Sequence, residues 1–154
     1  MAQEVEYPPD AHRRMVEALK GKFKPTVVVS IGTAGTIFGE RIAAILGVPH
    51  RKMVIKIQPK KAGLLAKIIH RERKLLTPLD EKLSPNDRIL IVDDNAKQGL
   101  TLKVAKRHLV EMGANPKNVK SVVYRTSIKA WPTFAVERQT PLFASRRRKR
   151  RMIK

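Results

Sequence analysis

Residues 89–102 place an apolar segment, an acidic pair and a glycine before a helical pattern, and this order strongly limits the fold. The four residues 89–92 are apolar and favour strands, Asp93 and Asp94 follow them, and Gly99 precedes apolar residues at helical spacing. A strand that is apolar on both faces is typical of a parallel sheet covered by helices. Because such sheets bind ligands beyond the carboxyl ends of their strands, we expect the two aspartates to line a binding site.

The same segment carries groups that suit a sugar phosphate. Two adjacent carboxylates can accept hydrogen bonds from vicinal hydroxyls. Gly99 lets the backbone approach an anion, and the free N–H groups of the following helix favour phosphate, with the Thr101 hydroxyl as a further donor. The alternative is that the aspartates only cap the next helix. One segment therefore offers groups for both halves of a ribose phosphate.

A second strand, glycine turn and helix lie earlier in the chain. Residues 26–31 are predicted to form a buried strand, residues 32–35 a glycine turn, and residues 37–46 a helix that Gly47 ends. The turn could instead be an ordinary tight turn. Because both turns follow strands, they would meet at one edge of the sheet, and the crevice between them is the predicted ligand site.

The other predicted elements continue this alternation. We expect a helix after Asp10 as N-cap, a strand at residues 52–57, a helix at 62–76, a helix from 102 to 112 and a strand at 119–124. Alternating strands and helices predict an α/β fold with a mostly parallel sheet flanked by helices, Rossmann-like in architecture.

Length and composition exclude several classes of protein. The 154 residues fit one domain, and no apolar run is long enough to cross a membrane. The N-terminus lacks the order of a secretory signal, so we expect a cytoplasmic protein without a membrane partner. The chain has no cysteine, and its four histidines show no metal-ligand spacing, so we expect no metal held by direct protein ligation.

The net charge of +20 indicates anionic partners. Residues 146–151 are all Arg or Lys, and we expect residues 146–154 to form a disordered basic tail that is either simply solvated or binds nucleic acid. Aromatic residues make up 5% of the chain, which weakens an interpretation as a single-strand-binding protein with base-stacking platforms.

Residues 89–101 resemble the ribose-phosphate-binding motif of type I phosphoribosyltransferases, in which an acidic pair precedes a loop ending Thr-Gly-x-Thr. Residues 31–49 are similar to the pyrophosphate loop and following helix of purine members such as adenine phosphoribosyltransferases. With the order of elements, the resemblance covers about residues 10–126. It implies the type I phosphoribosyltransferase fold with a small C-terminal hood, in a single domain over residues 1–145.

The resemblance also implies an activity. A phosphoribosyltransferase, which is a glycosyltransferase, moves ribose 5-phosphate from phosphoribosyl pyrophosphate to a nucleobase and releases pyrophosphate. The resemblance implies that the base is a purine and that the protein acts in nucleotide salvage. It also implies a homodimer. The implied cofactor is Mg²⁺, bound mainly through the sugar donor.

The resemblance assigns roles to particular residues. Asp93 and Asp94 would be catalytic and hold the ribose hydroxyls. The ribose-phosphate site would comprise Asp93, Asp94, Asn95, Ala96, Lys97, Gln98, Gly99, Leu100 and Thr101. The pyrophosphate site would comprise Gly32, Thr33, Ala34 and Gly35. Candidates for a pyrophosphate clamp, or else a solvated helix face, are Lys60, Lys61, Arg71 and Arg73.

Base recognition is assigned to the C-terminal part of the chain. Arg125 matches the cationic residue that contacts a 6-oxo group in purine enzymes, and Phe143 or Leu142 would stack on the base. Trp131 would line the hood. The alternative for Trp131 and Phe143 is packing in the core or in a dimer interface.

Three positions differ from the family pattern and keep a second hypothesis open. Lys97 stands where 6-oxopurine enzymes carry Asp, Gln98 where the loop usually has Thr, and Ala34 where the adenine-type turn has Arg. These residues suit binding better than chemistry. The alternative is a non-catalytic, nucleotide-sensing protein that binds nucleic acid through its basic surface. A third hypothesis is a nucleic-acid-binding structural domain without a ligand pocket.

Overall fold

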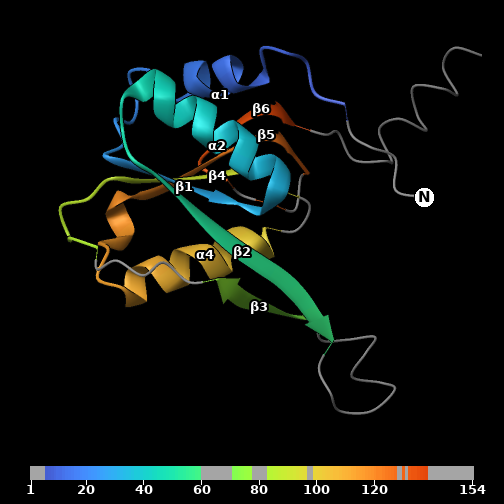
Figure 1. Cartoon of the computed structure of the whole chain (residues 1–154), viewed down its shortest axis with the longest axis vertical. Helices are drawn as coiled ribbons and strands as arrows, with labels where there is room; N and C mark the ends of the chain where they lie inside the picture. Colours follow the sequence, from blue (N-terminus) through green and yellow to red (C-terminus); the bar gives the residue numbers. More distant parts are fainter. Residues whose placement is uncertain are drawn as a thin grey trace, which may run out of the picture.

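A six-stranded sheet, five of whose strands are parallel, forms the centre of the computed structural model (Figure 1). The structure describes residues 6–59, 71–77, 83–96, 99–127, 130 and 132–138, except the side chains of 56–59 and 71–77. The strand order is β3-β2-β1-β4-β5-β6, with β3 antiparallel to β2. The strands are β1 (Val27–Ile31), β2 (His50–Pro59), β3 (Arg71–Thr77), β4 (Ile89–Ala96), β5 (Val119–Thr126) and β6 (Phe134–Arg138).

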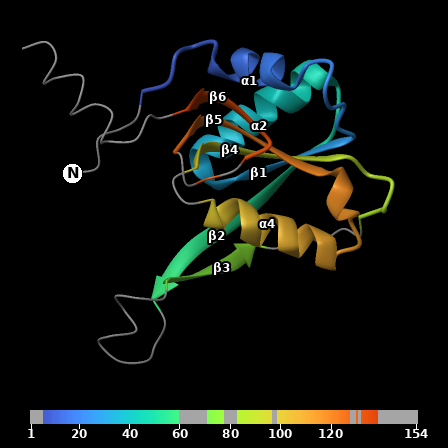
Figure 2. The ribbon, with the colours of Figure 1, turned by 180° about the vertical axis from the view of Figure 1, so that it is seen from behind.

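Helices cover both faces of this sheet (Figures 1 and 2). The helices α1 (Ala11–Leu19) and α2 (Gly32–Leu46) pack on one face, and α4 (Leu100–Glu111) packs on the other. A short 3₁₀ helix, η1 (Pro116–Asn118), leads into β5. Within the described residues, no helix is both long and apolar enough to cross a bilayer.

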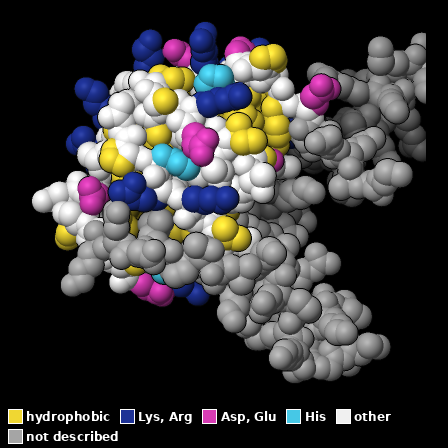
Figure 3. Space-filling view, in the orientation of Figure 1, with side chains coloured by type: hydrophobic (Ala, Val, Ile, Leu, Met, Phe, Trp, Pro, Cys, Tyr) yellow, Lys and Arg dark blue, Asp and Glu magenta, His cyan; other side chains and the backbone are white. Residues whose placement is uncertain are grey.

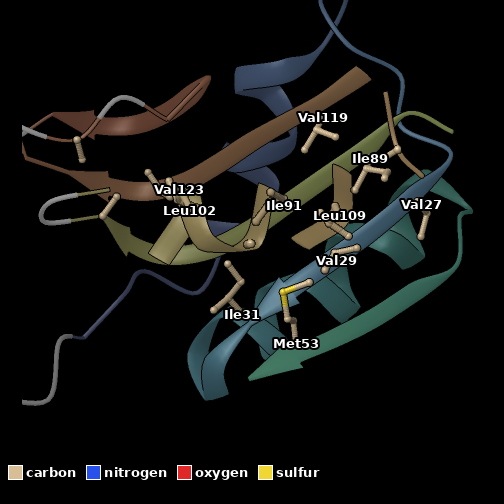
Figure 4. Close-up of a cluster of buried hydrophobic side chains, with 14 residues drawn as sticks. Val27, Val29, Ile31, Met53, Ile89, Ile91, Leu102, Leu109, Val119 and Val123 are labelled. Atoms are coloured by element: carbon tan, nitrogen blue, oxygen red, sulfur yellow. The ribbon is translucent and has the colours of Figure 1, made fainter. Parts of the chain in front are cut away.

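The central strands β1 and β4 carry apolar residues on both faces because each face contributes to a separate core. All five residues of β1 are buried. Its alternate side chains pack either with Met15 and Ile42 of the α1 and α2 layer or with Leu102 and Leu109 of α4 (Figure 4). The mostly apolar run at 26–31 and the apolar run at 89–92 thus reflect burial on both faces, as the sequence predicted.

The chain changes direction across the sheet between β1 and β4. From β1 it passes through α2 to β2 on one side, and from β4 it passes through α4 to β5 on the other. Right-handed crossovers in opposite directions place the two helices on opposite faces. Since β1 and β4 pair directly, with Ser30 opposite Val92, their carboxyl ends lie side by side at a topological switch point.

One predicted helix is wrong. Residues 71–76, expected in the helix at 62–76, belong to strand β3 (Arg71–Thr77) instead, while residues 62–70 lie outside the described residues. The reason is that β2 extends beyond the part that pairs with β1. Strand β1 pairs with residues 50–53 only, and β3 pairs with the rest of β2 from Val54 to Pro59. Backbone pairing along this projecting part of β2 outweighs the local apolar spacing.

Smaller differences concern the ends of elements. Helix α2 begins directly at Gly32, so the predicted turn is the first turn of the helix. Asp10 is the N-cap of α1, but its carboxylate accepts a hydrogen bond from Arg14 Nε at 3.0 Å rather than capping a backbone N–H. Residues 134–138, expected within the C-terminal hood, add β6 to the sheet, and residues 139–154, including the predicted tail, lie outside the described residues.

Two leucines of α4, one buried and one exposed, allow a matched test of this core. Leu109 is 0% exposed and Leu100 is 36% exposed. We expect Leu109→Ala to lower the free energy of unfolding by about 2–5 kcal/mol, because it leaves a cavity in the core. We expect Leu100→Ala to change it by less than about 1 kcal/mol. Urea denaturation measures both, and similar losses would contradict the packing of α4 described above.

Candidate functional site

Two helices begin next to each other at the switch point. Helix α2 starts at Gly32, whose φ is +70°, immediately after β1, and α4 starts after Gly99, whose φ is +73°, beyond the end of β4. Neither first turn contains an acidic residue. The first N–H groups of a helix lack intrahelical partners and lie at the positive end of its dipole. This edge of the sheet therefore offers two places for anionic groups.

The acidic pair lies at the same edge, against the start of α2. Asp93 is 9% exposed, and Asp94 is half-buried. The Oδ1 atom of Asp93 accepts a hydrogen bond from the Asp94 backbone N–H at 2.8 Å. A Cβ added to Gly35 would lie 3.1 Å from the Val92 carbonyl oxygen and 3.4 Å from Asp93 Oδ1. The glycine thus allows the first turn of α2 to approach Asp93 closely.

A buried polar cluster fixes the start of α2. The hydroxyl oxygens of Ser30 and Thr36 lie 3.3 Å apart. The Thr36 hydroxyl donates a hydrogen bond to the Gly32 carbonyl. Ser30 Oγ also lies 2.7 Å from His50 Nε2. Burial, more than the nearby Arg51, lowers the pKa of His50, while Glu40 opposes this shift. His50 is therefore a neutral hydrogen-bonding partner that links β1, α2 and β2.

Tyr7 holds the second aspartate and was not identified from the sequence. Its phenol donates a hydrogen bond to Asp94 Oδ2 at 2.9 Å. Its ring makes edge contacts with Phe38 and Tyr124, with both centroid distances 5.2 Å. Burial, followed by the charge and hydrogen bond of Asp94, raises the pKa of Tyr7 well above the usual range. The phenol therefore remains a donor at neutral and moderately alkaline pH.

Arg125 lies beside Tyr7, with its guanidinium carbon 5.9 Å from the centre of the tyrosine ring. Its Nε and Nη2 atoms donate to Glu137 Oε2 at 3.2 and 3.1 Å. The register of β5 and β6 places these two residues opposite each other. Tyr124 Oη donates to the other carboxylate oxygen of Glu137 at 3.3 Å. Glu137, also not identified from the sequence, thus orients the predicted base-contacting cation.

The structure brings together several of the predicted site residues. The first turn of α2 (residues 32–35) lies against Asp93, and Asp94 is connected through Tyr7 to Arg125. Asn95 pairs with Arg125 in the sheet, whereas Ala96 is buried in the core beneath α4. Thr101 is half-buried in the first turn of α4. The predicted residues outside the described side chains are Lys60, Lys61, Arg71, Arg73, Lys97, Gln98, Trp131, Leu142 and Phe143.

The donor set at this edge suits a metal that arrives with a ligand. In the described part of the chain, no three His, Asp or Glu side chains group closely enough to hold a metal ion. Mg²⁺ commonly keeps several waters and binds one or two carboxylates together with substrate phosphates. An acidic pair without a third such side chain beside it in the described residues therefore suits Mg²⁺ that is held mainly by a phosphorylated ligand.

The sequence is similar to those of known proteins. The phosphoribosyl transferase domain family matches residues 10–130. Adenine phosphoribosyltransferase 1 of Triticum aestivum is 32% identical over 133 residues, which are 79% of this chain and 69% of that protein. Adenine phosphoribosyltransferase of Carboxydothermus hydrogenoformans is 34% identical over 112 residues, 69% of this chain and 65% of that protein. The chain therefore spans about two thirds of the length of these curated relatives.

A solved structure supports the fold. The purine phosphoribosyltransferase from Pyrococcus horikoshii Ot3 superposes with a TM-score of 0.72 at 24% sequence identity. The superposition covers 84% of this chain and 81% of that chain. The expected type I phosphoribosyltransferase fold is confirmed.

Two glycines of α2 allow the approach to Asp93 to be tested. A Cβ at Gly35 would crowd the acidic pair, whereas a Cβ at Gly39 would lie 2.6 Å from Ser30 Cβ, in the polar cluster that fixes the helix start. We expect each change to Ala to destabilise the fold by about 1–3 kcal/mol through overpacking. Only Gly35→Ala should also weaken the binding of ribose 5-phosphate, by roughly 10-fold. Calorimetric titration below the unfolding temperature of both variants measures this, and equal weakening would contradict the assignment.

Proposed function

Because this chain belongs to the phosphoribosyl transferase domain family, we propose that it transfers ribose 5-phosphate from phosphoribosyl pyrophosphate to a purine base and releases pyrophosphate. The observation that carries this proposal is the meeting of three features at one switch point. The first turns of α2 and α4 follow adjacent strands, and Asp93 and Asp94 lie at the end of β4. The adenine phosphoribosyltransferases among the relatives support a role in purine salvage.

The proposed chemistry depends mainly on electrostatics. The bond from ribose C1 to pyrophosphate breaks, and its electron pair leaves with pyrophosphate. A ring nitrogen of the base then bonds to C1 and loses its proton to solvent. Asp93 and Asp94 accept hydrogen bonds from the ribose hydroxyls and stabilise positive charge that develops on the ribose. Preorganised carboxylates and N–H groups favour this charge separation without reorganising during the reaction.

The two helix starts hold the two phosphate groups in this proposal. The first turn of α4, with Thr101, binds the 5-phosphate, and the first turn of α2 binds pyrophosphate. Ala34 is half-buried and contributes no charge, so the α2 turn holds pyrophosphate through its backbone N–H groups. Bound Mg²⁺ supplies further charge neutralisation for the pyrophosphate.

Arg125 and Glu137 are the proposed contacts to the base. A guanidinium only donates hydrogen bonds and suits a 6-oxo group, whereas a carboxylate only accepts them and suits a 6-amino group. Both residues are paired at the carboxyl ends of β5 and β6, next to Tyr7. A purine panel must therefore include both adenine and 6-oxopurines.

The face shown in Figure 3 fits the transferase better than a nucleic-acid-binding protein. On the face shown in Figure 3, Lys and Arg side chains are scattered among acidic, apolar and histidine side chains. A nucleic-acid-binding surface more often has its cations clustered on one face or along a helix. The net charge of +20 also attracts small anions such as phosphoribosyl pyrophosphate.

Substitution of the acidic pair tests the proposal. We expect Asp93→Asn and Asp94→Asn each to weaken binding of the sugar donor with Mg²⁺ by roughly 10- to 100-fold, because each loses charged hydrogen bonds to ribose. Asp87→Asn is the matched control, since Asp87 lies just before the opposite end of β4 and bonds Ser84 N at 2.8 Å. Calorimetry measures donor binding, and a pyrophosphate assay with the purine panel measures turnover.

The outcomes separate the hypotheses. Purine-dependent release of pyrophosphate by the wild-type protein, lost in both site variants but kept by Asp87→Asn, supports the transferase. Donor binding without release from any base overturns that assignment and favours a non-catalytic sensor. Failure to bind the donor overturns both.

We also propose that the protein is a homodimer that associates through α2. Ile37 and Ile45 are 49% and 50% exposed and lie eight residues apart, on one side of this helix. Antiparallel pairing of two α2 helices about a twofold axis brings Ile37 of one chain near Ile45 of the other. The same pairing brings the exposed Glu40 and Arg41 of each chain toward those of its partner. In this proposal a second copy of the same chain covers the exposed face of α2.

Light scattering tests the dimer directly. We expect the wild-type protein to have the mass of two chains in solution and the double variant Ile37→Lys and Ile45→Lys that of one, because four buried charges would oppose association. Lys22→Glu is a control change at an exposed position away from α2. A monomeric wild-type protein, or a double variant that remains dimeric, contradicts this interface.

A further inference from the structure

Tyr7 contacts three parts of the proposed site at once. Its phenol bonds Asp94 on β4, its ring contacts Phe38 on α2, and the same ring lies against Tyr124 and Arg125 on β5. Phe38 is one helical turn beyond Gly35, which packs on Asp93. Tyr7 itself precedes α1 and is 87 residues from Asp94 in the sequence. A residue outside both recognised motifs therefore connects the pyrophosphate side, the ribose side and the base side.

We infer that Tyr7 is a positioning residue that orients the Asp94 carboxylate toward the ribose of the sugar donor. This inference rests on the proposed function. The phenol donates to Oδ2, and in this inference Oδ1 accepts a hydrogen bond from a ribose hydroxyl. An ionised carboxylate has about four lone-pair sites, so the bond to Tyr7 leaves acceptor capacity for a ligand.

The surroundings of Tyr7 make it suitable for this role. Edge contacts with two aromatic rings restrict the ring, and the Arg125 guanidinium lies near its face. Since burial and Asp94 raise the pKa of the phenol, Tyr7 keeps its proton and donates to Asp94. A fixed donor on one oxygen reduces the rotational freedom of the carboxylate before the ligand arrives, and preorganisation of this kind increases affinity.

Tyr7→Phe tests the inference, because it removes the hydroxyl and keeps the ring. We expect roughly 10-fold weaker binding of phosphoribosyl pyrophosphate and of ribose 5-phosphate, the loss typical of one hydrogen bond to a charged group. Binding of pyrophosphate alone should not change, because it does not use Asp94. A purely structural effect of the hydroxyl would weaken all three ligands together.

Tyr124→Phe is the matched control. Tyr124 is 1% exposed, contacts the same ring and donates to Glu137 rather than to Asp94. We expect this variant to bind the sugar donor as the wild-type protein does. Equal or tighter donor binding by Tyr7→Phe overturns the inference and shows that the phenol is dispensable or competes with ribose.

A second measurement needs no ligand. The chain has two tyrosines, so Tyr7 is the only one left in the Tyr124→Phe variant. Tyrosinate absorbance at about pH 11 should show Tyr7 largely protonated, although an ordinary tyrosine with a pKa of about 10 is mostly ionised there. Adding Asp94→Asn should lower the pKa of Tyr7 toward that ordinary value, with circular dichroism confirming the fold at this pH.

The two measurements distinguish the possible failures. A protonated Tyr7 with no donor binding by the wild-type protein overturns the proposed function, and the inference falls with it while the contact to Asp94 stands. Donor binding by the wild-type protein that Tyr7→Phe leaves unchanged overturns the inference alone. An ordinary pKa for Tyr7 overturns the contact from which the inference starts.

Discussion

The direct pairing of β1 with β4 is the constraint on which the rest of the structure depends. Both strands are buried on both faces, so each must be followed by a helix that covers the sheet. The chain leaves β1 toward β2 and leaves β4 toward β5, and right-handed crossovers then send α2 and α4 to opposite faces. The beginnings of the two helices consequently converge at one edge, where the acidic pair emerges. The site is thus a consequence of strand order.

The parts of the fold that follow from local pattern could be predicted from the sequence. Short runs of mostly apolar, strand-favouring residues identify β1 and β4, and Gly47 marks the end of α2 by adopting φ +66°. The sequence pattern places Gly35 within a turn. The need for glycine at this position is tertiary, however, because it depends on how closely α2 approaches Asp93.

Features that depend on distant partners could not be predicted in this way. Residues 71–77 carry helical spacing, but their conformation is set by the unpaired length of β2 beyond β1. Tyr7 lies in a short segment before α1 without any periodic pattern, and its function depends on Asp94, far along the chain. The contact of Glu137 with Arg125 follows only from the pairing of β6 with β5, which places the two residues opposite each other. In each case the deciding neighbour is brought close by the sheet rather than by the sequence.

The uncharged first turn of α2 has a consequence for how the site responds to its medium. Residues 32–35 contain no ionisable side chain, so the donors there are backbone N–H groups and the Thr33 hydroxyl, which do not titrate in the biological range. The turn itself therefore adds no titrating group, and Asp93, which packs against Gly35, is the protein side chain whose charge bears on affinity for an anion there. The electrostatic response of this side of the candidate site thus depends on Asp93 and on the bound anion, while the turn that follows β1 contributes a constant set of donors.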